Sequence, residues 1–181
     1  MRIGLVCLAL ILPAAALADG CPQAPDHVAA QSDLLDRIAA ADSQAQAQGL
    51  SNRLWQLWLD APDRPSQEML DAGMRARSLG DMLRALDRFE TLVNYCPFYA
   101  EGYNQRAFTR FLAGDYAAAL PDLDRALALN PAHVGALSGK ALTLLRMGRE
   151  AEGQAALRAA LDLNPWLAER ALLRDAPGED L

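Results

Sequence analysis

Small and apolar residues recur along the chain with a period of 34 residues. One glycine and one proline of each period keep this spacing: Gly80, Gly114 and Gly148, then Pro97, Pro131 and Pro165. A glycine tolerates the positive φ at the end of a helix. The residue before a proline is pushed out of the α region, so a helix ends there. The pattern therefore predicts three helical hairpins, over residues 66–99, 100–133 and 134–167.

The spacing also predicts how these hairpins pack. Ala85, Ala119 and Gly153 are small and again 34 residues apart, which allows the two helices of each hairpin to approach closely. Such helices are too short to be stable alone, and stacking buries the face that each hairpin leaves open. The leucines of the second helices are expected in this core: Leu123, Leu127, Leu129, Leu157 and Leu161.

The middle unit resembles the tetratricopeptide repeat. Tyr103 matches the aromatic fourth position, Ala107 the small eighth position, and Gly114-Asp115-Tyr116 the turn between the helices. The other matches in this unit are Ala119, Leu123, Ala126 and Pro131. Residues 66–99 match through Met69, Gly73, Gly80, Ala85, Phe89 and Pro97, and residues 134–167 through Leu137, Ala141, Leu144, Gly148, Gly153, Leu157, Ala160 and Pro165. The resemblance implies an all-α protein, a tetratricopeptide-repeat α-solenoid of helical hairpins.

Two flanking segments are expected to cover the ends of this stack. Residues 32–65 look like a degenerate repeat in the same register, with Leu35, Ile38 and Trp55 at matching positions, and are interpreted as an N-terminal capping hairpin. Residues 166–174 are expected to form a C-terminal capping helix. Residues 19–31 form an N-terminal tail and residues 175–181 an acidic tail, which is expected to fray.

The first eighteen residues have the pattern of a secretory signal peptide. A short positive start precedes an uncharged apolar run that is too short to span a membrane, and small residues precede a cleavage site near Ala18-Asp19. The alternative is a lipoprotein anchored at Cys21, but Asp19 places an acid where such an anchor needs a small or apolar run. We therefore expect a periplasmic or secreted protein without a membrane span.

Export changes the interpretation of the cysteines. Two remain after cleavage, Cys21 and Cys96, and an even pair in an oxidising compartment suggests one disulfide. In a stack of the kind implied above, both lie at the edge where second helices end, and ten extended residues span roughly 30 Å, enough to join them. The alternative is two unpaired thiols.

Composition and motifs give no indication of catalysis. The net charge of −6 and the pI near 4.9 predict no general attraction to nucleic acid, and no cofactor or metal site is expected. The two histidines, His27 and His133, lie in no metal or catalytic motif. Asp122 and Asp124 face opposite sides of a helix, and Asp122 is expected to be solvated.

By resemblance, function is expected in the concave groove, which the first helix of each hairpin lines. The candidate peptide-binding residues are Leu70, Met74, Arg77, Asn104, Gln105, Phe108, Phe111, Leu142, Leu145 and Arg146. Family members that bind chaperone C-termini use Lys, Asn and Arg at particular groove positions. Several of these positions are occupied here by Leu70, Met74, Gly135 and Gly139. The sequence therefore does not support binding of chaperone C-termini. Phe108 and Phe111 could instead be covered internally.

Two arginines occupy positions where the family usually has Leu and Tyr. Arg106 and Arg110 lie on one helix face, near the seam between helices. They are interpreted either as partners of Asp87 or Asp124, or as an anion contact at the edge of the groove.

The leading hypothesis is a non-catalytic module that binds a peptide segment of another envelope or exported protein. The alternative is a structural subunit of an envelope complex that self-associates. The sequence leaves the oligomeric state open.

Overall fold

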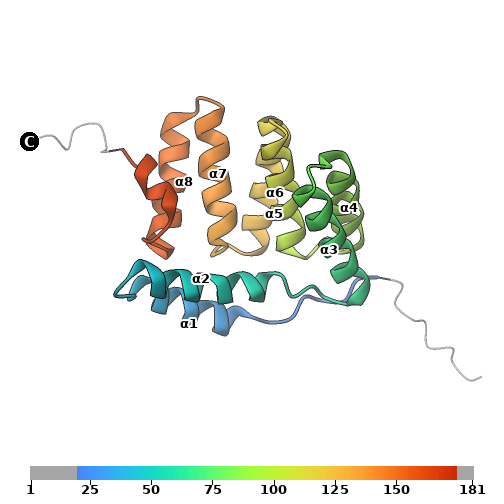
Figure 1. The fold of residues 1–181 in the computed structure, drawn as a ribbon, viewed down its shortest axis with the longest axis horizontal. Helices are drawn as coiled ribbons and strands as arrows, with labels where there is room; N and C mark the ends of the chain where they lie inside the picture. Colours follow the sequence, from blue (N-terminus) through green and yellow to red (C-terminus); the bar gives the residue numbers. More distant parts are fainter. Residues whose placement is uncertain (1–19, 175–181) are drawn as a thin grey trace, which may run out of the picture.

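A computed structural model describes residues 20–174, which form eight α-helices and one short 3₁₀ helix (Figure 1). The helices are α1 (Val28–Ala39), α2 (Gln44–Trp58), α3 (Arg64–Ser78), α4 (Met82–Tyr95), α5 (Ala100–Leu112), α6 (Tyr116–Leu129), α7 (Val134–Arg146), α8 (Glu150–Leu163) and η1 (Ala168–Leu172). No strand occurs in this part of the chain. The predicted signal peptide at 1–18, its predicted cleavage site and the acidic tail at 175–181 lie outside the described residues.

The three predicted hairpins are present as α3–α4, α5–α6 and α7–α8, stacked side by side (Figure 1). Each hairpin turns at a glycine with positive φ: 81° at Gly80, 80° at Gly114 and 73° at Gly148. Asp81 and Asp115 then begin α4 and α6, since each side chain accepts a hydrogen bond from the backbone of the new helix. The described part of the chain is therefore an all-helical solenoid, as predicted.

Small residues hold the helices of each hairpin together. Ala85 and Ala119 are fully buried. At Gly153 an added Cβ would lie 2.8 Å from the Leu145 side chain, so only glycine allows this approach of α8 to α7. Among the leucines expected in the core, Leu123 and Leu157 are buried, while Leu127, Leu129 and Leu161 are half-buried.

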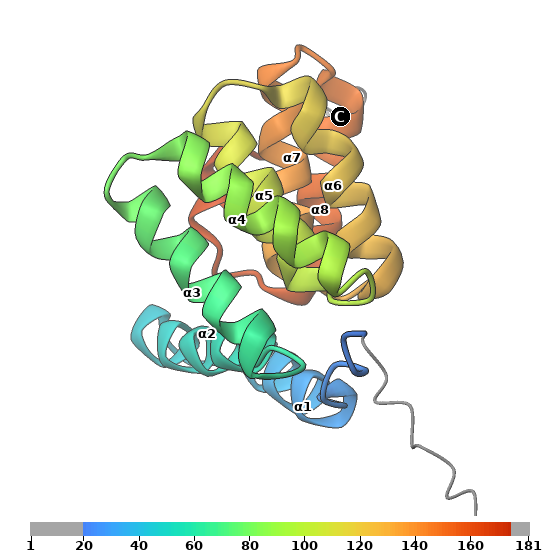
Figure 2. The same cartoon turned by 90° about the vertical axis from the view of Figure 1, so that its right-hand side faces the viewer.

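The N-terminal hairpin forms, but its placement differs from the expectation of a fourth unit in register. Figures 1 and 2 show α1 and α2 lying across the ends of the stacked helices instead of beside α3. Leu35, Ile38 and Leu54 pack in one cluster with Val134 of α7 and Trp166 after α8. The hairpin therefore covers one edge of the solenoid, where helices of the later repeats begin and end.

Polar contacts fix the hairpin on this edge. The Trp58 indole stacks on the His133 imidazole, with ring centroids 4.0 Å apart and planes inclined by 18°. Trp58 Nε1 donates to Gln31 Oε1 at 2.7 Å, and the Gln31 amide exchanges hydrogen bonds with Asn130. Tyr99 Oη donates to the Trp58 carbonyl at 2.6 Å. The hairpin is thus tied to the loops before α5 and α7.

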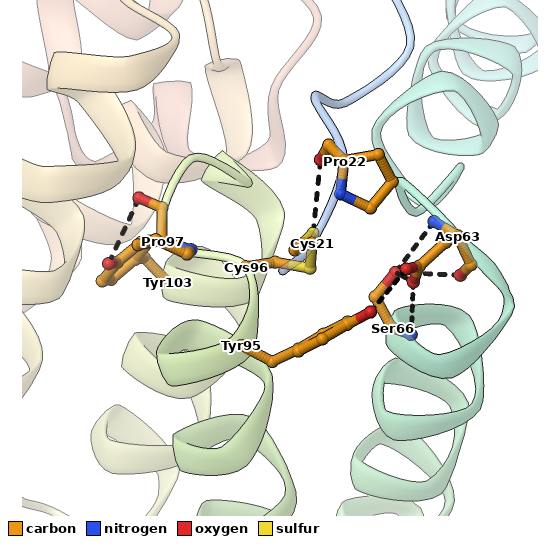
Figure 3. The surroundings of a disulfide bond; sticks show 8 residues. All are labelled: Cys21, Pro22, Asp63, Ser66, Tyr95, Cys96, Pro97 and Tyr103. Carbon is orange, nitrogen blue, oxygen red and sulfur yellow. Dashed lines mark hydrogen bonds between the residues drawn. A yellow bond between two sulfur atoms is a disulfide. The ribbon is translucent and has the colours of Figure 1, made fainter. Parts of the chain in front are cut away.

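The N-terminal tail is joined to the end of α4. The Sγ atoms of Cys21 and Cys96 lie 1.94 Å apart, and Cys96 is 1% exposed. Figure 3 shows this pair beside Tyr95, whose hydroxyl donates to Asp63 at the start of α3. The tail also enters a helix earlier than expected, since α1 begins at Val28.

The C-terminal segment is shorter than the capping helix expected at 166–174. Only residues 168–172 are helical, as a 3₁₀ turn without a buried residue. Gln154 of α8 holds this turn by donating to the Leu172 carbonyl at 2.9 Å.

The interpretation of Asp122 as a solvated residue was wrong. Its side chain is 5% exposed and accepts hydrogen bonds from both Arg106, at 2.9 Å, and Arg110, at 2.7 Å. Arg106 also pairs with Glu90 of the preceding repeat. The arginines are therefore structural ion-pair partners, but of Asp122 and Glu90 instead of Asp87 or Asp124. Periodicity placed Asp122 and Asp124 on opposite sides of α6, but it did not show that the side of Asp122 is buried or that the arginines of α5 reach it.

Candidate peptide-binding cleft

A cavity of about 600 Å³ lies between the first helices of the three repeats, α2 and the η1 turn. Helices α3, α5 and α7 form its concave wall, α2 forms its floor, and the segment from Trp166 to Glu169 closes one end. Because the N-terminal hairpin lies across the edge of the solenoid (Figure 1), the groove expected to be open is a cleft with α2 as its floor.

Most of the predicted groove residues line this cleft. They are Met74, Arg77, Asn104, Gln105, Phe108, Phe111 and Leu142. Three others lie elsewhere: Leu70 is fully buried in the core of the first repeat, Leu145 packs against Gly153, and Arg146 is exposed outside the cavity.

One face of α2 supplies residues that the sequence analysis did not assign to the site. Gln44, Gln48, Ser51 and Trp55 all line the cleft. Their spacing of four, three and four residues places them on one side of a helix. Trp55 lies so close to α7 that a Cβ added at Gly135 would be 2.8 Å from its ring. Gly135 is thus a contact point for the floor of the cleft.

The cleft gathers the large aromatic side chains. All three tryptophans of the chain, Trp55, Trp58 and Trp166, line it. Phe108 is 46% exposed within the cleft, while Phe111 packs against the Tyr116 ring at 5.3 Å. Of the two phenylalanines, Phe108 therefore presents the more accessible apolar surface. Trp55 and Trp58 lie close together in the sequence and were a signal that could have indicated the floor of this site.

Of the described residues that line the cleft, Arg77 is the one cation and Glu169 the one anion. The Arg77 guanidinium carbon lies 4.7 Å from the centroid of the Phe108 ring. Nη1 donates to the Gln105 carbonyl at 3.3 Å, and within residues 20–174 no carboxylate pairs with this guanidinium. Burial lowers the pKa of Arg77, partly offset by the nearby Glu101 charge. A guanidinium nevertheless remains protonated in proteins.

A buried carboxylate organises the wall behind Arg77. Glu101 is 1% exposed and accepts hydrogen bonds from Asn104, at 3.0 Å, and from Gln105. His133 Nε2 lies 2.8 Å from the same carboxylate, while Nδ1 accepts from the Ala136 amide. Because Nδ1 accepts, the imidazole proton resides on Nε2 and is donated to Glu101. These contacts orient Asn104 and Gln105 at the cleft wall.

Two buried side-chain atoms of residues that line the cleft have no hydrogen-bond partner among the described residues. They are Oε1 of Gln105, an acceptor, and Nε1 of Trp166, a donor. Gln105 is 4% exposed, and its other amide atom, Nε2, already donates to Glu101. A buried polar atom without a partner is costly unless a ligand or solvent satisfies it.

Three further observations concern the ionisation of Tyr99, metal binding and membrane insertion. Burial strongly raises the pKa of Tyr99, and the charges of Glu101, Asp60 and Asp71 raise it further, so its hydroxyl remains a hydrogen-bond donor. Within residues 20–174 no group of three or more His, Cys, Asp or Glu side chains is arranged to hold a metal ion. No helix in the same range has the length and apolar character needed to cross a membrane.

Comparison with known proteins agrees with this architecture. Residues 110–174 match the family model of the tetratricopeptide repeat. A TPR repeat-containing protein of Rhizobium etli is 36% identical over 81 residues, which cover 45% of this chain and 40% of the relative. Tetratricopeptide repeat protein 36 of Bos taurus is 51% identical over 55 residues, or 30% of this chain and 29% of that protein. The chain thus spans less than half the length of these relatives.

Solved structures show the same fold. The first TPR domain of Spaghetti (RPAP3), bound to the HSP90 peptide SRMEEVD, superposes with a TM-score of 0.58 at 20% identity, covering 59% of this chain and 85% of that one. The crystal structure of MamA superposes with a TM-score of 0.53 at 23% identity, covering 55% of this chain and 58% of that one. The described residues therefore have the fold of these tetratricopeptide-repeat structures, and residues 110–174 resemble the repeat in sequence as well.

Proposed function

We propose that this protein is a non-catalytic interaction module that binds a peptide segment of another protein in the cleft. The observation that carries the proposal is the cleft itself, which combines aromatic surface with amide side chains on both its wall and its floor. Apolar pockets with a few convergent polar groups are typical binding sites. Structural neighbours with bound HSP90 and HSP70 peptides support this use of the fold.

The proposed partner is another exported or envelope protein. The signal-peptide pattern at residues 1–18 supports this compartment, as does the approach of Cys21 to Cys96, because disulfides persist in oxidising environments. The proposal therefore places binding in the periplasm or outside the cell.

The test is affinity capture from the periplasmic fraction of cells that express the protein. Phe108→Glu places a charge on the exposed aromatic surface of the cleft. Phe98→Glu makes the same change at a phenylalanine that is 66% exposed and outside the cleft, and so serves as the matched control. A partner captured by the wild type and by Phe98→Glu, and lost with Phe108→Glu, supports the proposal. A partner that both variants retain counts against the cleft.

A second candidate function is self-association, which rests on a separate observation. Leu79 and Leu83, at the turn between α3 and α4, are 84% and 83% exposed. Adjacent exposed leucines are a candidate contact surface between copies. Light scattering on the mature protein tests this function: a dimer that dissociates on Leu83→Glu supports it, and a monomer at all concentrations contradicts it.

A further inference from the structure

We propose that Arg77 makes the cleft selective for a peptide segment in which an acidic side chain lies next to a large apolar side chain. The inference rests on the proposed function and specifies its ligand. It starts from the electrostatics of the cleft, where a half-buried cation has packing partners and backbone contacts but no ion-pair partner within residues 20–174.

Charge complementarity favours one carboxylate at Arg77. The buried Glu101 carboxylate already accepts hydrogen bonds from Asn104, Gln105 and His133, so it is committed to the wall behind the cleft. Among the described residues, Arg77 donates only to the Gln105 carbonyl and the Thr109 hydroxyl, at 3.3 and 3.4 Å, which are long contacts to neutral acceptors. A guanidinium forms its strongest hydrogen bonds with carboxylates. A ligand carboxylate would therefore replace weak contacts by strong ones.

The surroundings of Arg77 favour a carboxylate on a side chain. The guanidinium packs over the partly exposed Phe108 ring. An Asp or Glu side chain brings methylene groups to this ring while its charge reaches Arg77, and a neighbouring apolar residue then extends over the aromatic surface toward Leu142 and Trp55.

The cleft continues beyond Arg77 along the repeats, which favours a peptide over a small ligand. Arg77, Gln105 and Trp166 lie on α3, on α5 and after α8, so the three groups extend over all three repeats. A peptide running along the cleft can contact all three residues, whereas one small carboxylic acid at Arg77 would fill only part of a cavity of about 600 Å³.

The experiment is selection from random peptide libraries by the purified full chain in its exported form. One library presents each peptide internally, between fixed flanks, and a second leaves the peptide C-terminus free. Wild type is compared with Arg77→Gln and with a matched control, Arg146→Gln, at an exposed arginine outside the cleft. We expect wild type and Arg146→Gln to enrich internal peptides with Asp or Glu beside a large apolar residue. Arg77→Gln should retain the apolar preference and lose the acidic one.

The best internal peptide then provides a quantitative test. Changing its acidic residue to the corresponding amide should weaken binding to wild type about tenfold, the loss of one charge-assisted hydrogen-bonded pair, and leave binding to Arg77→Gln nearly unchanged. An equal loss for both proteins would overturn the role of Arg77. Enrichment of neutral peptides, or of free C-termini alone, would overturn the side-chain assignment while leaving peptide binding intact. No enrichment from either library would reject both this inference and the proposed function.

Discussion

Trp58 at the end of α2 stacks on His133 before α7, with ring centroids 4.0 Å apart, and these two residues are 75 positions apart in the chain. The stack joins the N-terminal hairpin to a loop of the solenoid. His133 in turn donates to the buried Glu101, so the floor and the wall of the cleft share one set of contacts. The cleft therefore depends on this junction.

Removing the indole should destabilise the whole molecule. Trp58 is 7% exposed, and replacing a buried aromatic residue by alanine typically costs about 3–5 kcal/mol in the free energy of unfolding. Urea denaturation of Trp58→Ala measures this loss. Gln56→Ala, an exposed position on the same helix, should change the free energy by less than about 0.5 kcal/mol. Equal, small effects of both substitutions would show that the hairpin does not hold the edge of the solenoid.

The cysteine pair makes a second prediction. Protein isolated from the periplasm without reductant should be lighter than the reduced protein by the mass of two hydrogen atoms, and Cys21 and Cys96 should resist alkylation. Closing a loop of this length stabilises a protein by about 4 kcal/mol in the chain-entropy model, and often by less. Reduction should therefore lower the urea midpoint. Complete alkylation without reductant would contradict the pairing.

Asp122 should be far more important for stability than its neighbour Asp124. The Asp122 side chain is 5% exposed and holds two arginines, so Asp122→Ala leaves both without their buried partner, a change that costs about 3–5 kcal/mol. The Asp124 side chain is 53% exposed and pairs with Lys140. Asp124→Ala should cost less than about 1 kcal/mol. Denaturation curves that coincide would contradict the buried ion-pair network.

Acid should weaken the junction between α3 and α4. Burial raises the pKa of Asp63, but hydrogen bonds from Ser66 and Tyr95 outweigh it, and the pKa lies below its ordinary value of 3.8. A carboxyl group whose pKa is lowered by folding stabilises the protein above its unfolded pKa, and this stability is lost as the pH falls through the folded value. Stability should therefore fall below about pH 4, with Asp63 contributing to the slope.

Asp63→Asn tests this contribution, because asparagine can still cap α3 but does not titrate. The difference in unfolding free energy between wild type and Asp63→Asn should shrink between pH 5 and pH 2, since the wild-type advantage is lost. A difference that stays constant over this range would show that Asp63 does not titrate with folding.

The repeats could be predicted from the sequence, whereas the floor of the cleft could not. Gly80, Gly114 and Gly148 occupy the positive-φ turns. Because every repeat needs such a turn at the same position, the glycines recur every 34 residues and can be recognised in the sequence. The contact of Gln31 with Asn130, by contrast, joins residues 99 positions apart through two amide groups that fit no repeat. Nothing in the local pattern of residues 32–65 distinguished a hairpin stacked beside α3 from one laid across the edge.

The residues of the candidate site could be predicted only in part, for the same reason. Arg77, Gln105 and Phe108 were predicted because the repeat register fixes which face of a helix is concave. Leu70 was assigned to the groove by that register and is instead fully buried. Trp55 and Gln48 were missed because their role depends on where α2 lies. The repeat register gives the position of a residue within its repeat, but it does not show which other element packs against that repeat.

The central claim, that a partner segment occupies the cleft, can be tested most directly by site-specific photocrosslinking in cells that export the protein. A photoreactive residue at Leu142 lies in the cleft, and one at Leu83 lies outside it on an exposed turn. We predict a crosslinked partner from position 142, abolished by Phe108→Glu, and none of the same mass from position 83. Crosslinking of that partner from position 83 alone, or from both positions regardless of Phe108→Glu, would contradict binding in the cleft.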